Sequence, residues 1–313
     1  MQPRRPACSP ASIFRRELRR SRPAMRRSWL RSNGNWPPSR LRRATRQPRE
    51  TGMSIFDLTG KVVAATGGMS GIGLAFLQGC ARQGASVVIL DRTIDQAESV
   101  RDRLKALGAP IVHVERCDVS DDEAVDAAFA SIIGAMGRID CVFANAGISH
   151  RAPSFVDLTN QDYHRLLDIN LHGAFYTLRA AARHMKARAL DGDPGGSIVA
   201  CGSLSIYYGL PGMEHYAAAK AALQAMIKGL AVEMGPYGVR ANMLVPGFIL
   251  TGLTSESARA QEVAEHFAKI TPLGRPGDLS DIEGPAAYLA SDASKFQTGG
   301  TMIIDGGRRV RND

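Results

Sequence analysis

Tyr216 and Lys220 are the residues whose types and spacing most directly suggest chemistry. They stand four apart in SLSIYYGLPGMEHYAAAK, where an alanine-rich run predicts a helix. Residues four apart share one helix face, so a phenol and an ammonium group lie side by side. A neighbouring cation favours the phenolate, which can accept a proton from an alcohol near neutral pH. Taken alone, the same spacing also fits an ordinary helix face.

Ser203 lies thirteen residues before Tyr216 and directly follows an apolar run, 197–201, that predicts a buried strand. A hydroxyl group at the end of a strand and a Tyr–Lys pair on the next helix can converge on one carbonyl oxygen. The pattern therefore predicts proton transfer to or from a small alcohol or ketone.

A glycine-rich turn, Thr66–Gly73 (TGGMSGIG), lies between a predicted strand, 61–66, and a predicted helix that runs to about Arg82. Glycines allow a tight turn and close approach of the backbone to a ligand. The N-terminus of the following helix supplies amide groups for a pyrophosphate. The spacing is GxxxGxG, and its strand–turn–helix context predicts a dinucleotide site.

Asp91 ends the next predicted strand, 86–91, eighteen residues after Gly73. A carboxylate there can accept hydrogen bonds from the adenosine ribose and repels a 2′-phosphate, which favours NAD over NADP. Arg92 follows directly and could reach a phosphate, so NADP stays open. An N-cap or exposed turn is the structural alternative for Asp91.

Polar residues also follow two other predicted strands. Asp118 comes after the third strand, and Asn145-Ala146-Gly147 after the fourth. Open α/β sheets bind ligands at the carboxyl ends of their strands, although each of these residues also fits an ordinary loop. Asn170 stands within a predicted helix, where asparagine is unfavourable, so we expect a packing or hydrogen-bonding reason for it.

Strands that alternate with helices predict the fold class. The fold is an α/β, Rossmann-like, doubly wound parallel sheet of about seven strands with helices on both faces, formed by a single domain. The predicted strands are 61–66, 86–91, 111–116, 139–145, 197–201, 239–245 and 301–305.

Composition restricts the other classes of protein. No run approaches 18 apolar residues, so we expect no membrane-spanning helix. The five cysteines form no CxxC pair and the seven histidines show no metal-ligand spacing. We therefore expect a reduced, cytoplasmic protein without a metal site.

The basic charge is confined to the N-terminal segment, 1–52. Its first 50 residues hold 15 arginines, no lysine and two glutamates, whereas the remaining chain carries a net charge of −4. Many prolines interrupt this segment, so it cannot bury a core. A nucleic-acid or membrane-binding arm and an organelle transit peptide are alternatives, but we favour a non-native extension upstream of Met53. We expect 53–313 to be the catalytic domain, with no nucleic-acid partner.

Together, these motifs resemble those of the classical short-chain dehydrogenase/reductase family. The resemblance runs from about Phe56 to Gly307. Its ordered elements are Thr66–Gly73, Asn145–Gly147, Asn170, Ser203, Tyr216-x-x-x-Lys220, Pro246-Gly247 and Asp305-Gly306-Gly307. Ala219 departs mildly from the family, which often has serine before the lysine.

The resemblance implies a role for each catalytic residue. Tyr216 would be the acid/base, and Lys220 would favour its phenolate and hold the nicotinamide ribose. Ser203 would position the substrate oxygen, and Asn170 would maintain a water-linked proton path towards Lys220.

The resemblance also implies a set of residues that bind the cofactor. The glycine turn would hold the pyrophosphate, Asp91 the adenosine ribose, and Asp118 with Val119 the adenine. Further residues would contact the nicotinamide side. The full set is Gly67, Ser70, Gly71, Ile72, Gly73, Asp91, Asp118, Val119, Asn145, Ala146, Gly147, Tyr216, Lys220, Pro246, Gly247, Ile249 and Thr251.

The sequence therefore predicts an NAD-dependent oxidoreductase of secondary alcohols and ketones, and by resemblance a homotetramer. An NADPH-dependent 3-oxoacyl-thioester reductase and a non-catalytic cofactor-binding module remain alternatives. We expect the substrate pocket to include Ser149, His150, Arg151, Tyr207, Tyr208, Met213 and the segment 249–275. The segment 253–270 resembles the family's lid helix, and the resemblance implies that it gates the site.

Overall fold

Seven parallel strands form one sheet in the computed structural model, which describes residues 54–251 and 260–311. The strand order is β3-β2-β1-β4-β5-β6-β7, and the prediction of a doubly wound sheet is confirmed. Our interpretation of 1–52 lies outside the described residues, as does the first part of the predicted lid. The strands are β1 Val62–Thr66, β2 Ser86–Asp91, β3 Val112–Arg116, β4 Cys141–Ala144, β5 Gly196–Cys201, β6 Val239–Pro246 and β7 Thr301–Ile304.

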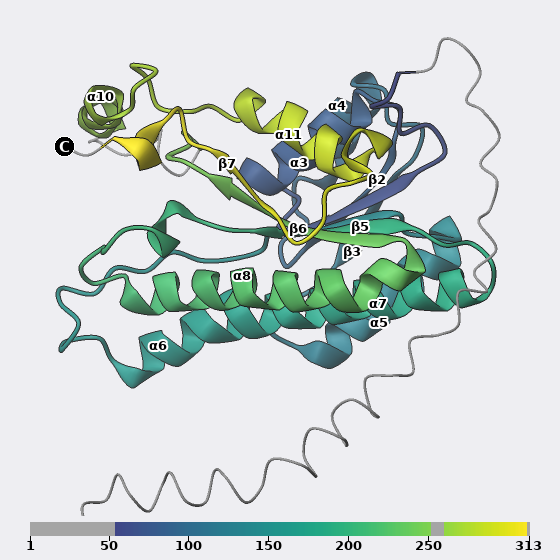
Figure 1. The fold of residues 1–313 in the computed structure, drawn as a ribbon, viewed down its shortest axis with the longest axis horizontal. Helices are drawn as coiled ribbons and strands as arrows, with labels where there is room; N and C mark the ends of the chain where they lie inside the picture. The colour runs from purple at the N-terminus through teal and green to yellow at the C-terminus, as the bar shows by residue number, and fades with distance from the viewer. Residues whose placement is uncertain (1–53, 252–259, 312–313) are drawn as a thin grey trace, which may run out of the picture. The chain divides into compact units, whose positions relative to one another are not determined.

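Helices cover both faces of the sheet (Figure 1). One layer holds α3 Gly71–Ala81, α4 Ala97–Ala106 and α11 Ser280–Ala290, and the other holds α5 Asp122–Met136, α7 Ala174–Leu190 and α8 Glu214–Met234. Two further helices are α6 Asn160–Leu167 and α10 Ala260–Ile270, and a π-helix, η1 Asp168–Gly173, joins α6 to α7. The short 3₁₀-helices are η2 Leu204–Ile206, η3 Gly235–Tyr237, η4 Asp292–Ser294 and η5 Arg308–Val310.

The central strands β1 and β4 are mostly apolar because both of their faces are buried. In β1, Val62 and Ala64 belong to the core beneath α5, α7 and α8, whereas Val63 and Ala65 belong to the core beneath α3, α4 and α11. Side chains alternate between the faces of a strand, so a continuous apolar run fills two cores at once.

Helix α11 was not predicted; Gly284 and Pro285 lie inside it, and interior proline disfavours a helix. Its packing against α3 explains why it forms. A Cβ atom at Gly79 of α3 would stand 2.2 Å from the backbone oxygen of Glu283, so only glycine allows this approach. Arg82 Nε also donates a hydrogen bond of 2.9 Å to Glu283 Oε2.

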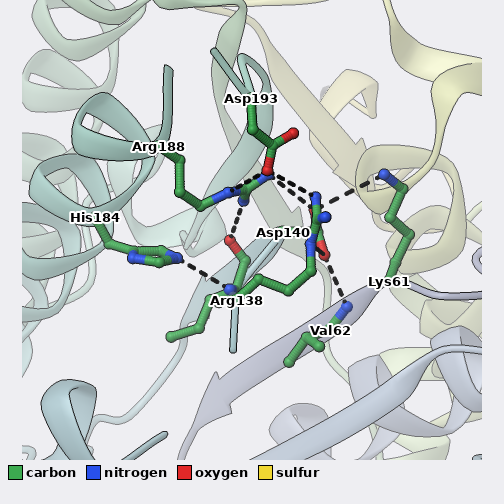
Figure 2. A network of polar contacts seen from close by, with 8 residues as sticks. Lys61, Val62, Arg138, Asp140, His184, Arg188 and Asp193 are labelled. Atoms are coloured by element: carbon green, nitrogen blue, oxygen red, sulfur yellow. Dashed lines mark hydrogen bonds and ion pairs between the residues drawn. The ribbon is translucent and has the colours of Figure 1, made fainter. Parts of the chain in front are cut away.

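A cluster of charged residues joins β1 and β4 at the amino ends of the strands (Figure 2). The Asp140 carboxylate is at its centre and is 9% exposed. It accepts hydrogen bonds from the Val62 backbone at 3.0 Å and from Arg138 at 2.6 Å and 2.9 Å. Arg188 and Lys61 lie 3.4 Å and 3.8 Å away. Burial alone would raise the pKa of Asp140, but the hydrogen bonds from Arg138 and Val62 and the charges of Lys61 and Arg138 lower it below its ordinary value.

Several other classes of feature are absent from residues 54–251 and 260–311. Within these ranges, no helix is long and apolar enough to cross a membrane. No three His, Cys, Asp or Glu side chains gather there to hold a metal ion. The four described cysteines are free and buried.

Candidate active site

A cleft of about 500 Å³ opens at the carboxyl ends of the strands and gathers most of the predicted site residues. Its predicted lining residues are Gly67, Ser70, Ile72, Asp91, Asp118, Val119, Asn145, Ala146, Gly147, Asn170, Ser203, Tyr216, Lys220, Pro246, Gly247 and Thr251. Sequence reasoning missed some lining residues that have no polar signature, including Cys117, Ile148 and Ile169.

Three predicted cofactor residues lie outside this lining. Gly71 has a φ angle of +54°, which suits glycine, and begins helix α3. Gly73 packs so tightly that a Cβ atom would stand 2.1 Å from the backbone oxygen of Gly67. Ile249 is 7% exposed, and its side chain packs into the core beneath α3 and α11. The two glycines therefore shape the turn, and the Ile249 side chain points away from the cleft.

The Tyr–Lys pair lies on one face of α8, as its spacing predicts. Lys220 is 4% exposed, and its Nζ atom lies 5.8 Å from the centre of the Tyr216 ring. Nζ donates a hydrogen bond of 2.9 Å to the backbone oxygen of Cys201, the last residue of β5. This bond positions the lysine between the strand end and the phenol. This is the one hydrogen bond that the Lys220 side chain makes with the described residues, so two of its three N–H groups can donate to a ligand.

Ser203 stands two residues beyond the end of β5, as the N-cap of η2. Its Oγ atom accepts a hydrogen bond of 3.2 Å from the backbone N–H of Ser205. An accepting hydroxyl keeps its own proton available, so Ser203 can donate to an oxygen in the cleft. Ser203, Tyr216 and Lys220 all line the cleft, so the structure brings the predicted trio to one site.

Thr66 fixes the turn that follows β4. Its Oγ1 atom accepts hydrogen bonds from the backbone N–H groups of Asn145 and Ala146, at 3.0 Å and 3.1 Å. In return, Asn145 Nδ2 donates to the Thr66 backbone oxygen at 3.0 Å. These hydrogen bonds connect the carboxyl ends of β1 and β4 at the floor of the cleft. The position of Thr66 at the end of its strand was the available sequence signal.

Asn170 lies inside the π-helix η1 and is 1% exposed. Its side chain accepts a 2.8 Å hydrogen bond from the N–H of Ile148 and donates a 2.9 Å bond to the Ile148 backbone oxygen. The predicted hydrogen-bonding reason for an asparagine in a helix is therefore confirmed. A π turn adds one residue to a helical turn and often marks a functional site. Here it aims Asn170 at the loop after β4.

Two carboxylates lie at the other end of the cleft from Tyr216. Asp91 accepts hydrogen bonds of 3.1 Å from the backbone N–H groups of Met69 and Thr93. Asp118 accepts from the hydroxyl and backbone N–H of Ser120, and the hydroxyl bond is the main cause of its lowered pKa. Arg92, the residue that kept NADP open, also lines the cleft.

The shape and donors of the cleft fit a dinucleotide. A Cβ atom on Gly67 would stand 3.0 Å from Asn145 Nδ2 and 3.2 Å from Ala146 Cα, so glycine keeps this floor open. The N-terminus of α3 follows the turn and offers amide groups to a pyrophosphate. Asp91 supplies acceptors for ribose hydroxyls, and Lys220 supplies free donors for a second ribose.

A second cavity of about 790 Å³ meets the cleft at Ser203 and Tyr216. Four of the six individually predicted pocket residues line it, Ser149, Arg151, Tyr208 and Met213, and the predicted segment 249–275 contributes His266, Phe267 and Ile270. The other two individually predicted residues do not line it. Tyr207 packs against the core beneath α5, α7 and α8, and His150 contacts His215. Sequence reasoning missed Arg308 of η5, which also lines this cavity.

His215, next to Tyr216, is buried at 1% exposure on another part of α8. Its Nε2 atom lies 3.3 Å from Nδ1 of His150, and His150 Nε2 lies 4.0 Å from Asp162. Among the described residues, His215 Nδ1 has no hydrogen-bond partner. Burial and the neighbouring His150 lower the pKa of His215, outweighing the opposite influence of Glu214 and Asp162.

The lowered pKa values of two histidines predict how the stability of the protein depends on pH. The pKa values of His215 and His184 are lowered in the folded protein, in both cases mainly by burial. The unfolded chain therefore binds protons more readily once the pH falls below about 6.5, and the free energy of unfolding decreases there. Guanidinium denaturation between about pH 8 and pH 5.5 measures this slope. His215→Gln should flatten it, and an equal slope in both proteins would contradict the role given to His215.

Comparisons with known proteins agree with this geometry. A family model described as enoyl-(acyl carrier protein) reductase matches residues 67–309. The chain is 36% identical over 254 residues to an L-rhamnose 1-dehydrogenase (NAD(P)(+)) of Azotobacter vinelandii, covering 80% of this chain and 97% of that protein. It is 34% identical over 256 residues to a gluconate 5-dehydrogenase of Gluconobacter oxydans, covering 82% and 97%.

A solved structure of a dehydrogenase is also similar to this chain. The gluconate 5-dehydrogenase of Burkholderia cenocepacia, in complex with NADP and tartrate, is 33% identical and superposes with a TM-score of 0.75, covering 83% of this chain and 99% of that one. Fold, motif order and relatives agree. The chain belongs to the classical short-chain dehydrogenase/reductase family, whose members are NAD(P)-dependent oxidoreductases of CH–OH groups.

Proposed function

We propose that the chain is an NAD-dependent dehydrogenase of secondary alcohols. In the reverse direction it reduces the corresponding ketones. The observation that carries this proposal is that Ser203, Tyr216 and Lys220 all line the dinucleotide cleft, and that Ser203 and Tyr216 also line the second cavity. The names of the relatives support it, because they include dehydrogenases of rhamnose and gluconate.

In this proposal Tyr216 moves the proton. Its phenolate takes the hydroxyl proton of the alcohol as the carbonyl forms, and the phenol returns a proton in the reverse direction. Ser203 donates a hydrogen bond to the substrate oxygen and so fixes it beside the phenol. Lys220, whose cation lies 5.8 Å from the ring centre, stabilises the phenolate by its charge.

The bound nicotinamide cofactor accepts the hydride from the carbinol carbon or returns it. The chain's residues bind and orient this cofactor. Asp91 would hold the adenosine ribose, and Asp118 with Val119 the adenine. The turn Gly67–Gly73 would hold the pyrophosphate. The cleft residues that follow β4 and β6 would contact the nicotinamide side of the cofactor. Asn170 would hold the loop after β4 and a water-linked proton path towards Lys220.

The preference for NAD rests on the Asp91 carboxylate. Asp91→Asn keeps an oxygen that can accept the Met69 N–H but removes the charge that repels a 2′-phosphate. We expect NAD⁺ affinity to fall by about tenfold or more, since hydrogen bonds to charged groups contribute about 1.5–3 kcal/mol. The affinity ratio of NADP⁺ to NAD⁺ should rise, and calorimetric titration with both cofactors measures it.

Arg92→Met is the matched variant for this titration. Arg92 is exposed, lines the same cleft and is the candidate partner of a 2′-phosphate. This substitution should weaken the binding of NADP⁺ and leave the binding of NAD⁺ unchanged. A wild-type preference for NADP⁺ that Arg92→Met removes would reject the assignment of NAD and favour the alternative reductase. A 3-oxoacyl-[acyl-carrier-protein] reductase of Chlamydia pneumoniae, 35% identical, is among the relatives.

The proposed activity is tested by incubating the protein with NAD⁺ and a panel of secondary alcohols and by measuring NADH. Production of NADH that requires both alcohol and protein supports the proposal. A protein that binds NAD⁺ but oxidises no member, and reduces none of the matching ketones, would instead be a cofactor-binding module.

Assembly and location complete the proposal. We propose a homotetramer that pairs through α7 and α8, since Phe175 and Val232 on these helices are 39% and 68% exposed. An apolar hollow of about 490 Å³, lined by Phe175, Met226 and Leu230, lies between the same helices. We also propose that 53–313 is the catalytic domain and that the enzyme acts in the cytoplasm.

A further inference from the structure

The cavity beside Tyr216 combines catalytic, aromatic and cationic side chains. Ser203 and Tyr216 stand where it meets the dinucleotide cleft, and Tyr208 and Phe248 form part of its wall. Two guanidinium groups complete the lining: Arg151, from the loop after β4, and Arg308, from η5. These arginines come from segments that lie far apart in the sequence, and the fold brings both to one cavity.

Neither arginine has a carboxylate partner among the described residues. No acidic residue is among the described residues that line the cavity. Throughout residues 54–251 and 260–311, no carboxylate oxygen lies within 4.0 Å of either guanidinium. The contrast is Arg275, which binds both oxygens of Asp281 at 2.6 Å and 2.7 Å. Two cations without a carboxylate partner in the described part of the chain, on the wall of a cavity that contains the proton-transfer group, favour an anionic occupant.

The backbone that carries Arg308 is firmly held. The turn before it uses φ angles of +62° at Gly306 and +88° at Gly307. Asp305 accepts hydrogen bonds from the N–H groups of Gly307 and Arg309, at 2.8 Å and 2.7 Å. The Tyr208 hydroxyl donates a 2.9 Å bond to the Arg308 backbone oxygen. The Arg308 guanidinium lies 5.2 Å from the centre of the Tyr208 ring, so the aromatic face supports the cation.

We propose that the substrate is a secondary alcohol that bears a carboxylate, or the corresponding keto acid. Arg308 binds the carboxylate, Arg151 adds the second positive charge, and the carbinol oxygen lies at Ser203 and Tyr216. A guanidinium matches a carboxylate through two parallel hydrogen bonds, which fixes the direction as well as the position of the substrate. The inference rests on the proposed function and adds to it the substrate class.

The first test compares each hydroxy acid with its neutral amide. The protein with NAD⁺ is assayed on such pairs, with the chain length between carboxylate and alcohol varied. We expect kcat/KM to be about ten- to a hundredfold higher for the acid of at least one pair, the range given by one charge-assisted hydrogen bond. Amides oxidised as efficiently as their acids, or turnover of phosphate esters alone, would overturn the carboxylate assignment.

The second test uses Arg308→Met, with Arg309→Met as its control. Both variants remove one positive charge from adjacent positions of η5. Arg309 lies over Tyr207, 4.4 Å from the ring centre, and is not among the residues that line the cavity. The acid-to-amide ratio should fall by about tenfold in Arg308→Met and stay at the wild-type value in Arg309→Met. An equal fall in both variants would mean that general charge, and not a binding site, sets the preference.

The outcomes separate this inference from the proposed function. Oxidation of neutral alcohols alone keeps the function and overturns the anion site. If no member of the panel is oxidised, the acids are titrated calorimetrically into the protein with NADH. Acid binding that Arg308→Met weakens and Arg309→Met does not would retain the anion site without the activity. No acid binding would overturn both.

Discussion

Replacing Tyr216 by phenylalanine should lower kcat/KM by about a thousandfold, within the range that positioned acid/base groups contribute. The ring and its packing remain, including the Lys220 cation 5.8 Å from the ring centre. Only the hydroxyl that carries the proton is lost. Steady-state kinetics on the best alcohol of the panel measures the effect, and calorimetric titration with NAD⁺ should give nearly the wild-type affinity.

Tyr207→Phe is the matched control. Tyr207 packs against the core, and among the described residues its hydroxyl makes a single long contact, of 3.5 Å, with Gln224. This variant should keep wild-type kinetics within about twofold, because Tyr207 itself lines neither cavity. If Tyr216→Phe retained more than about a tenth of the activity, another group would have to move the proton.

Replacing Asp140 by asparagine should lower the free energy of unfolding by about 3 kcal/mol, because removing one partner of a buried ion pair leaves the others unpaired. Lys61 loses its described counter-charge, and Arg138 and Arg188 keep only the exposed Asp193 as a described partner (Figure 2). Guanidinium denaturation at neutral pH measures the loss.

The sign of the pH dependence provides a second check. The pKa of Asp140 is lowered on folding, so its contribution exists above about pH 3.9 and disappears as acid protonates it. The wild type and Asp140→Asn should therefore converge in stability at low pH. Asp193→Asn is the control: this side chain binds the same arginines but is 53% exposed. It should cost less than about 1 kcal/mol. A similar cost for both variants would show that burial does not set the strength of the cluster.

The sequence predicted the fold well where local signals agreed. The strand Ser86–Asp91 was predicted with its observed bounds, because an apolar run buried on both faces ends at the first acid. The position of Asp91 in the cleft followed from that boundary. The Tyr216–Lys220 pair was equally predictable, since helix periodicity alone places the two side chains on one face.

The missed features depend on tertiary contacts that no local pattern reveals. Helix α11 forms despite Pro285 because α3 offers a glycine at the contact. The π turn around Asn170 depends on hydrogen bonds to Ile148, 22 residues away. Arg308 follows the last strand in a short polar stretch. Nothing in that stretch shows that a turn of two glycines carries it to the cavity beside Tyr216.

The separation of the Asp140 cluster from the cleft, at opposite ends of the same strands, has a consequence for engineering. Changes to substrate choice usually lower stability, and a protein tolerates them only while it stays above a threshold. Here the loops that would be randomised in a library begin where the strands end, whereas the ionic anchor lies where they start. New specificities can therefore be selected in the loops while the anchor keeps its contribution intact, which makes this chain a suitable starting point for directed evolution.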